Sequence, residues 1–240
     1  MSDRAAIVTG ASRGIGFAIA ELLATEGYQL TLTARRSATL LQAADTLASR
    51  GHDVQQFPAD LADEDGIRAV VAAHRRRYGR LDVLVNSGGV IAGAGAHEHP
   101  TQSIDMQLDV NLRAIMLFYR ESLELLRAAG AEHGNALVVN LASLAGKIPQ
   151  PWVSVYSATK AAVIAYSAAM NRELGRYGVK SVALCPGFVD TDFNNGLPGG
   201  PVRERMIRPQ DVAASVRFLL VLSPAAVVPE IIFQGPSGVA

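Results

Sequence analysis

The feature that most constrains the fold lies near the N-terminus, where a short apolar run passes through a glycine-rich turn into a helical pattern. The run is Ala6-Ile7-Val8, the turn covers residues 9–16 (TGASRGIG), and residues 17–23 (FAIAELL) show the helical pattern. Glycines let a backbone turn tightly and approach a pyrophosphate, whose charge then lies at a helix N-terminus. The spacing G-x-x-x-G-x-G differs from the common G-x-G-x-x-G fingerprint. By itself, the segment leaves a simple strand-to-helix turn open.

Similar apolar, β-branched runs recur along the chain and alternate with helical patterns. We expect strands near residues 30–33, 53–58, 81–85, 136–141, 179–184 and 230–233, and helices near residues 37–50, 104–126 and 209–222, with another from about residue 154. This alternation predicts an α/β fold, a doubly wound parallel sheet with helices on both faces. A chain of this length suits one domain, so we expect residues 1–240 to form a single unit.

A tyrosine and a lysine stand four residues apart at the start of the helix expected near residue 154. On a helix, Tyr156 and Lys160 project from the same face, one turn apart. A free phenol titrates near pH ~10, and a cation beside it favours the phenolate and lowers that pKa. In a partly desolvated cleft the two side chains would be a proton donor with its own cation. On an exposed face they would be an ordinary surface pair.

Together these segments resemble the short-chain dehydrogenase/reductase family over nearly the whole chain, in particular its 3-oxoacyl-[acyl-carrier-protein] reductase-like members. The matching residues, in the family's order and approximate spacing, are Thr9 to Gly16, Asp60-Leu61, Asn86, Asn111, Ser143, Tyr156, Lys160 and Pro186-Gly187 with Thr191. The resemblance implies a single-domain Rossmann fold that binds NAD(P) and an oxidoreductase that transfers hydride.

The resemblance also implies roles for individual side chains. Tyr156 would protonate a carbonyl oxygen that Ser143 hydrogen-bonds, and Lys160 would lower the phenol pKa and bind the nicotinamide ribose. Asn111 would hold a water that links Lys160 to solvent. The residues expected to bind the cofactor are Gly10, Ser12, Arg13, Gly14, Ile15, Gly16, Arg35, Arg36, Asp60, Leu61, Asn86, Tyr156, Lys160, Pro186, Gly187, Val189 and Thr191. Asp60 has a second interpretation, as a helix cap before residues 62–65.

The residues after the second expected strand predict which cofactor is bound. An NAD site usually has Asp or Glu about 20 residues beyond the glycine turn, where it accepts from the ribose 2′-hydroxyl. Here Arg35 and Arg36 occupy that region, and Arg13 lies within the turn. Guanidinium groups suit a 2′-phosphate, so we expect NADP(H), unless these arginines simply face solvent.

One segment departs from the family pattern. Where the family has Asn-Asn-Ala-Gly, this chain has Asn86-Ser87-Gly88-Gly89. Because glycine is conformationally permissive, Gly88 is expected to make the loop less rigid.

Charge and composition exclude other classes of function. Basic and acidic residues number 22 each, so there is no net field for nucleic acid or an anionic membrane. We expect the basic cluster at residues 75–77 to lie at a solvated helix end. The single cysteine, Cys185, is expected to be a buried small hydrophobe. Neither a signal-peptide pattern nor an apolar run of ~20 residues occurs, so we expect a cytoplasmic protein without nucleic-acid or membrane partners.

A histidine pair resembles a metal-binding motif but has too few ligands. His97 and His99 flank Glu98 in a short loop, and no third ligand lies nearby in the sequence. We therefore expect no metal site.

These observations predict an NADP(H)-dependent oxidoreductase that interconverts a carbonyl and a secondary alcohol. A non-catalytic NADP(H)-binding sensor or scaffold and an NAD-linked alcohol dehydrogenase stay open as alternatives. Residues 192–208, rich in glycine and proline, are typical of a functional lid or a disordered link, and the family resemblance implies a lid over the substrate. A 3-oxoacyl thioester, a steroid, a sugar and a small ketone all fit as substrates. The alanine-rich face of the helix after Tyr156 predicts a homo-oligomer, a tetramer or a dimer.

Overall fold

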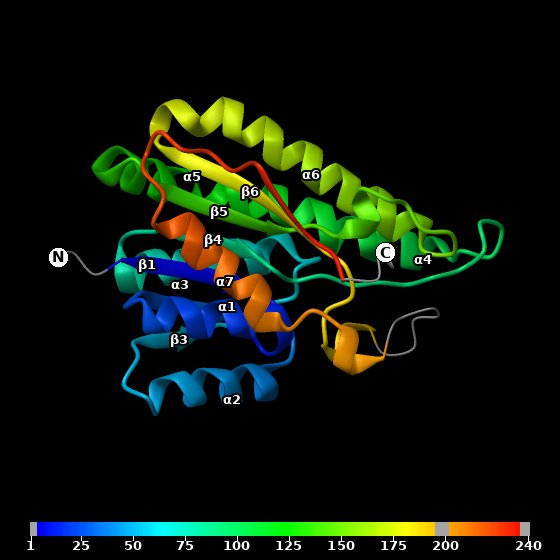
Figure 1. Cartoon of the computed structure of the whole chain (residues 1–240). Coiled ribbons are helices and arrows are strands. Elements are labelled where there is room, and N and C mark those ends of the chain that lie inside the picture. Colours follow the sequence, from blue (N-terminus) through cyan, green and yellow to red (C-terminus); the bar gives the residue numbers. More distant parts are fainter. Residues whose placement is uncertain (1–3, 195–201, 236–240) are drawn as a thin grey trace.

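The computed structural model describes residues 4–194 and 202–235 (Figure 1). In this part of the chain the strands form one sheet and are β1 (Ala5–Thr9), β2 (Gln29–Thr33), β3 (Val54–Gln56), β4 (Val83–Asn86), β5 (Ala136–Leu141), β6 (Val179–Pro186) and β7 (Glu230–Phe233). Their order is β3-β2-β1-β4-β5-β6-β7, and all neighbouring strands are parallel. The predicted single-domain Rossmann fold with a doubly wound parallel sheet is confirmed.

Helices cover both faces of this sheet. They are α1 (Gly14–Thr25), α2 (Ser37–Ala48), α3 (Glu64–Tyr78), α4 (Thr101–Leu108), α5 (Ala114–His133), α6 (Ser154–Leu174) and α7 (Pro209–Leu220). Buried side chains of α1, α2 and α7 form one hydrophobic cluster with the sheet. Those of α3, α5 and α6 form a second cluster on the opposite face.

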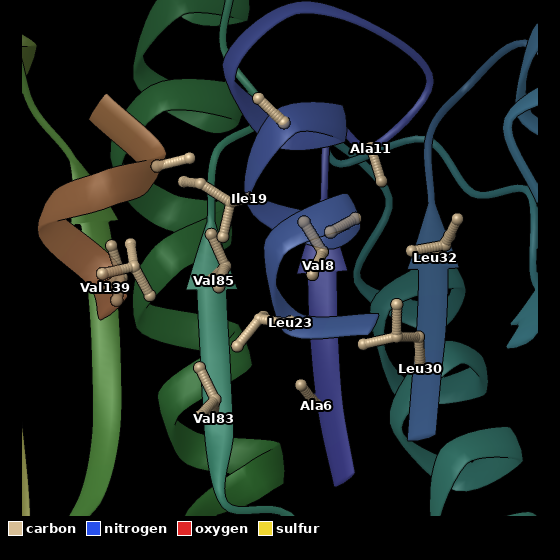
Figure 2. Close-up of a cluster of buried hydrophobic side chains, with 14 of the residues drawn as sticks. Ala6, Val8, Ala11, Ile19, Leu23, Leu30, Leu32, Val83, Val85 and Val139 are labelled. Atoms are coloured by element: carbon tan, nitrogen blue, oxygen red, sulfur yellow. The ribbon is translucent and has the colours of Figure 1, made fainter. Parts of the chain in front are cut away.

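The central strands are mostly apolar because both of their faces are buried. Successive side chains of a strand point to opposite faces. Val8 of β1 and Val85 of β4 therefore pack with Ile19 of α1, as Figure 2 shows, whereas Ile7 and Leu84 belong to the other cluster. The runs that predicted these strands are the consequence of burial from both sides.

The helix predicted over residues 104–126 is longer than expected and is interrupted. α4 and α5 are joined by a π-helical turn, Asp109–Arg113, so the helical segment extends from Thr101 to His133. Single π turns inside helices are rare and often lie at functional sites. This one contains Asn111, whose side chain the next subsection places.

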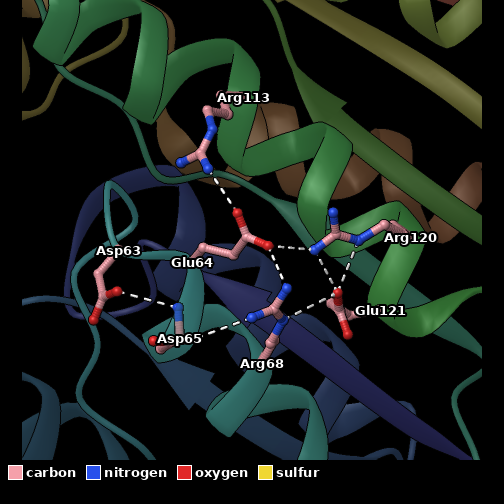
Figure 3. Close-up of polar contacts among 7 residues, drawn as sticks. All are labelled: Asp63, Glu64, Asp65, Arg68, Arg113, Arg120 and Glu121. Carbon is pink, nitrogen blue, oxygen red and sulfur yellow. Dashed lines mark hydrogen bonds and ion pairs between the residues drawn. The ribbon is translucent and has the colours of Figure 1, made fainter.

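An ion-pair network fastens α3 to this interrupted helix (Figure 3). The Glu64 carboxylate, at the start of α3, accepts from Arg113 at 2.7 Å and from Arg120 at 2.7 Å, and it also pairs with Arg68. The bond from Arg120, together with the neighbouring guanidinium charges, holds the pKa of the Glu64 carboxyl below its ordinary range. Since Arg113 is the last residue of the π turn, the network also holds that turn against α3.

Two further predictions about individual segments are confirmed. Cys185 is fully buried near the end of β6, and burial raises the pKa of its thiol to about 12. Residues 75–77 occupy the exposed last turn of α3. Among the helices of residues 4–194 and 202–235, none is long and apolar enough to cross a membrane.

Candidate active site

A cavity of about 880 Å³ lies along the edge of the sheet where the strands have their carboxyl ends. In open α/β sheets ligands bind at this edge, beside the point where the strand order reverses, which here is between β1 and β4. The predicted residues that line it are Gly10, Ser12, Arg13, Gly14, Ile15, Gly16, Arg35, Arg36, Asp60, Leu61, Ser143, Tyr156, Lys160, Pro186, Gly187, Val189 and Thr191. Only Asn86 and Asn111, of the predicted site residues, do not line this cavity.

The glycine turn brings main chain directly against main chain. Gly10 and Gly14 have positive φ angles of 63° and 59°. A Cβ atom on Gly10 would lie 2.8 Å from the backbone of Gly88, and one on Gly16 would lie 2.4 Å from the carbonyl oxygen of Gly10. Side chains at these positions would therefore fill the space in which the turn meets the loop after β4.

Gly88 contributes to this close packing. A Cβ atom on Gly88 would lie 2.2 Å from Cδ1 of Leu61. The main-chain N–H groups of Ser87 and Gly88 both donate to Oγ1 of Thr9, each at 3.0 Å. The departure from the family pattern thus fits the tight contact between the loops after β1, β3 and β4, and its effect on the rigidity of the loop stays a prediction.

The N-terminus of α1 faces the cavity with its main-chain donors uncapped by a side chain. Arg13 is the N-cap residue and makes no side-chain capping bond. The first N–H groups of a helix have no partner within the helix, and together with the helix dipole they favour an anion. The residues of this turn therefore suit a phosphate group.

Three arginines line the same part of the cavity. Nη1 of Arg13 pairs with Asp192 at 3.0 Å, and both side chains are more than half exposed. Arg35 and Arg36 are exposed, and neither forms an ion pair with another described residue. At the end of β2 the cavity thus has two unpaired guanidinium groups and no carboxylate.

The capping role considered for Asp60 is wrong. Its Oδ1 atom accepts from the N–H of Ala62 in a local turn, and the N-cap of α3 is Asp63, whose side chain accepts from the N–H of Asp65. Asp60 lines the cavity instead.

The predicted serine, tyrosine and lysine come together at the other end of the cavity. Ser143 follows β5 and caps a short 3₁₀ turn, Leu144–Gly146, by accepting from the N–H of Ala145 at 3.1 Å. Tyr156 and Lys160 occupy the first turns of α6, and Nζ of Lys160 lies 5.6 Å from the centre of the Tyr156 ring. Both side chains are buried, so the alternative of an exposed surface pair is wrong.

Burial shifts the pKa values of this pair in opposite directions. It raises the pKa of the Tyr156 phenol to about 12, which the nearby Ser143 side chain partly offsets. It lowers the pKa of Lys160 to about 8. Lys160 does not contribute to the shift of the Tyr156 pKa in this structure, and its Nζ atom donates to the carbonyl oxygen of Leu141 at 2.6 Å.

The π turn directs the Asn111 side chain to the loop after β4, near Tyr156 and Lys160. Its Nδ2 atom donates to the carbonyl oxygen of Val90 and its Oδ1 atom accepts from the N–H of Val90, both at 2.8 Å. Nδ2 also donates to Oγ1 of Thr159 at 3.3 Å. Asn111 therefore links the loop after β4 to α6 next to Lys160.

Asn86 points into the protein rather than into the cavity. Its Nδ2 atom donates to Oδ1 of Asn140 at 2.8 Å, and Asn140 in turn donates to Tyr119 and Ser167. This buried polar network joins β4, β5, α5 and α6. A direct contact of the Asn86 side chain with a ligand in the cavity is therefore not supported.

The histidine pair does not form a metal centre. His99 bonds with Ser103 and Gln107, whereas His97 is exposed and lies 3.7 Å from Glu98. No group of three or more His, Cys, Asp or Glu side chains within the described ranges is arranged to hold a metal ion.

With this geometry established, comparison with known proteins identifies the family. The model of the short chain dehydrogenase family matches residues 4–199. The chain belongs to this family. An uncharacterized oxidoreductase of Staphylococcus aureus strain USA300 is 30% identical over 220 residues, which cover 92% of each chain.

Several solved structures share both the fold and its extent. An alcohol dehydrogenase from the archaeon Thermococcus sibiricus, complexed with 5-hydroxy-NADP, has a TM-score of 0.87 and 29% identity, with 97% of each chain covered. A variant of actinorhodin polyketide ketoreductase with NADPH also has a TM-score of 0.87 and 29% identity, covering 98% of this chain and 97% of that one. A short-chain dehydrogenase from Burkholderia cenocepacia J2315, in complex with NADP, has the same score and identity over the same shares.

Several cavity residues were not among the predicted site residues, although one of them, Phe193, lies within the predicted lid. The apolar ones beyond Tyr156 include Ile91, Leu144, Val153, Phe188 and Phe193. They lie on three different loops, so no periodic pattern connects them. Phe193 is closest to the predicted chemistry, with its ring centre 6.2 Å from that of Tyr156, and its only sequence signal is its place in the irregular segment after β6.

Proposed function

We propose that this short-chain dehydrogenase is an NADP(H)-dependent oxidoreductase that interconverts a carbonyl and a secondary alcohol. The observation that carries the proposal is the single cavity with Ser143, Tyr156 and Lys160 at one end and the uncapped glycine turn at the other. A dinucleotide is long enough to occupy both ends of this cavity at once. The short-chain dehydrogenase structures with bound NADP(H) described above support this choice.

The residues present fit this cofactor. The contact of Gly10 and Gly16 with neighbouring main chain leaves backbone N–H groups open to a pyrophosphate. Arg35 and Arg36 would hold the 2′-phosphate, and Lys160 would contact the nicotinamide ribose. When bound, the nicotinamide supplies or accepts the hydride.

The side chains around Tyr156 carry the proton chemistry. A pKa of about 12 keeps the phenol protonated at neutral pH, which is the form that can donate to a carbonyl oxygen during reduction. The Ser143 hydroxyl would donate a hydrogen bond to the same oxygen. Lys160, still mostly charged below its pKa of about 8, would stabilise the phenolate that remains. Asn111 would support a proton relay to Lys160, since its bonds to Val90 and Thr159 lie beside that residue.

Residues 192–208 are proposed as a substrate lid. Residues 195–201 lie outside the described residues. Of the described flanks, Asp192–Asn194 places Phe193 beside Tyr156, and Arg203 reaches back to Asp190 and Asp192 at 3.3 Å and 3.6 Å. A phenylalanine at this position would exclude water from the reacting carbonyl.

The proposed partners are a small carbonyl or alcohol and further copies of this chain, with neither nucleic acid nor membrane involved. The residues of α6 that support self-association are Ala158, Ala161, Ala165 and Ala168, all exposed on the same helix. Light scattering at micromolar concentration should give a mass above 25.3 kDa; a monomer would contradict this part. A cytoplasmic location is also proposed, in keeping with a single, buried cysteine.

The cofactor preference follows from Arg35 and Arg36. NADPH should bind more tightly than NADH, and Arg35→Asp should narrow or reverse the preference by removing a cation and adding a carboxylate. Arg76→Asp, an equal charge change at an exposed position outside the cavity, is the control and should leave the preference unchanged. The measurement is fluorescence titration with both cofactors. Equal affinities in the unmodified protein would show the assignment to be wrong.

The role of Tyr156 is tested by removing one oxygen atom. Tyr156→Phe keeps the ring, so folding and NADPH binding should survive while carbonyl reduction falls by at least ~10²-fold. Tyr166→Phe, on the same helix but away from the cavity, is the matched control and should keep most activity. A Tyr156→Phe protein with near-native turnover would refute the assignment. An unmodified protein that binds NADPH but reduces no carbonyl would favour the sensor or scaffold.

A further inference from the structure

Trp152, in the loop between β5 and α6, has an unusual backbone conformation. Its φ angle is 71°, and no other non-glycine residue of the described chain has a positive φ. A bulky side chain in this left-handed region is strained, and such strain persists where the surroundings impose it and often marks a ligand site. The indole is 43% exposed, so burial in the core does not explain the conformation.

Contacts with the loop after β4 hold Trp152 in place. The carbonyl oxygen of Trp152 accepts from the N–H of Ala94 at 2.9 Å. The six-membered part of the indole ring lies directly on Gly93. A Cβ atom there would come within 2.4 Å of Cε3, 2.5 Å of Cζ3 and 2.6 Å of Cδ2. Only glycine leaves room for the ring, so Gly93 acts as its seat.

The seated indole forms a wall of the cavity. Trp152 lines the cavity, whereas Gly93 does not, so the ring has its seat on one side and the cavity on the other. The wall continues with apolar side chains from three loops, namely Ile91, Leu144, Val153, Phe188 and Phe193. Tyr156 lines the same cavity, and Phe193, which belongs to this wall, lies beside Tyr156. The wall therefore reaches the proposed reaction centre.

Charged side chains are absent from this wall in the described part of the chain. The charged residues that line the cavity are Arg13, Arg35, Arg36, Asp60, Lys160 and Asp192. The first four belong to the cofactor end, Asp192 pairs with Arg13, and Lys160 is buried against the carbonyl oxygen of Leu141. A carboxylate or phosphate on the substrate would lose water beside this wall without gaining a cation.

We infer that Trp152, seated on Gly93, is a specificity-determining residue, and that the site takes a neutral carbonyl compound with an apolar ring that lies against the indole. This inference rests on the proposed function, because it takes the cavity to be the active site. It adds a separate claim about which carbonyl compounds bind there. An apolar ring covers the exposed indole face, and the absence of a cation excludes anionic analogues.

The chain offers a direct probe, since Trp152 is its single tryptophan. The holoprotein, saturated with NADP⁺, is titrated with 4-methylcyclohexanone and with 4-oxocyclohexanecarboxylate, which share the ring and the ketone and differ in charge. The neutral ketone should change the fluorescence emission of Trp152 saturably and should reduce its quenching by acrylamide. Its Kd should be at least about 10-fold lower than that of the carboxylate. No saturable change, or equal binding of the two, would overturn the inference.

Variants distinguish the packing of the indole on Gly93 from the contact of the indole with the ligand. Gly93→Ala should displace the indole, alter its emission in the free protein and weaken binding of the neutral ketone by about 10-fold. Gly95→Ala, in the same loop and outside the cavity, is the matched control and should change neither. By calorimetry, Trp152→Ala should bind the neutral ketone about 10-fold more weakly, and Trp152→Phe should recover part of the loss. Unchanged ketone binding in both Gly93→Ala and Trp152→Ala would overturn the inference.

Oxidation of NADPH in the same ketone mixtures distinguishes this inference from the proposed function. Saturable, charge-selective binding without turnover would leave the inference standing and contradict the enzyme. Turnover with equal use of the neutral and anionic ketones would support the enzyme and overturn the inference.

Discussion

The structure depends on a buried ammonium group. Lys160 lies between the sheet and α6, and the bond from its Nζ atom to the Leu141 carbonyl oxygen replaces part of the water it has lost. Burial lowers its pKa to about 8, so its charge persists at neutral pH but is weakly held. A buried charge of this kind is costly unless it is paired. The presence of this buried ammonium beside Tyr156 is the strongest physical argument that the two residues carry out chemistry rather than stabilise the fold.

The opposite end of the cavity is shaped by the absence of side chains. Gly10 lets the loops after β1 and β4 meet main chain to main chain, and Gly88 leaves room for the Leu61 side chain. The N-cap residue of α1 makes no side-chain capping bond. One end thus offers donors and arginines to a phosphate, and the other offers a proton donor and a cation to a carbonyl. The parallel sheet brings the two ends together because every strand delivers its following loop to the same edge.

The sequence predicted the fold and most of the cavity, because buried parallel strands are continuous apolar runs and because glycine turns and the Tyr156–Lys160 spacing are local patterns. It could not give the direction of a side chain that depends on distant segments. Asn86 turns toward Asn140, Asp63 rather than Asp60 caps α3, and Lys160 donates to the carbonyl oxygen of Leu141. The seat of Trp152 on Gly93 joins loops 59 positions apart, which no local pattern records.

The central claim, that the fold holds a desolvated Lys160 whose pKa is lowered, can be measured directly because the chain has only three lysines, Lys147, Lys160 and Lys180. A protein labelled with ¹³C-lysine gives three side-chain signals, each assigned by a Lys→Arg variant, whose pH titrations can be followed by NMR. The Lys160 signal should titrate near pH 8, well below the usual 10.5. Titration of Lys160 at or above 10.5 would contradict the account, since it would mean that the ammonium is solvated.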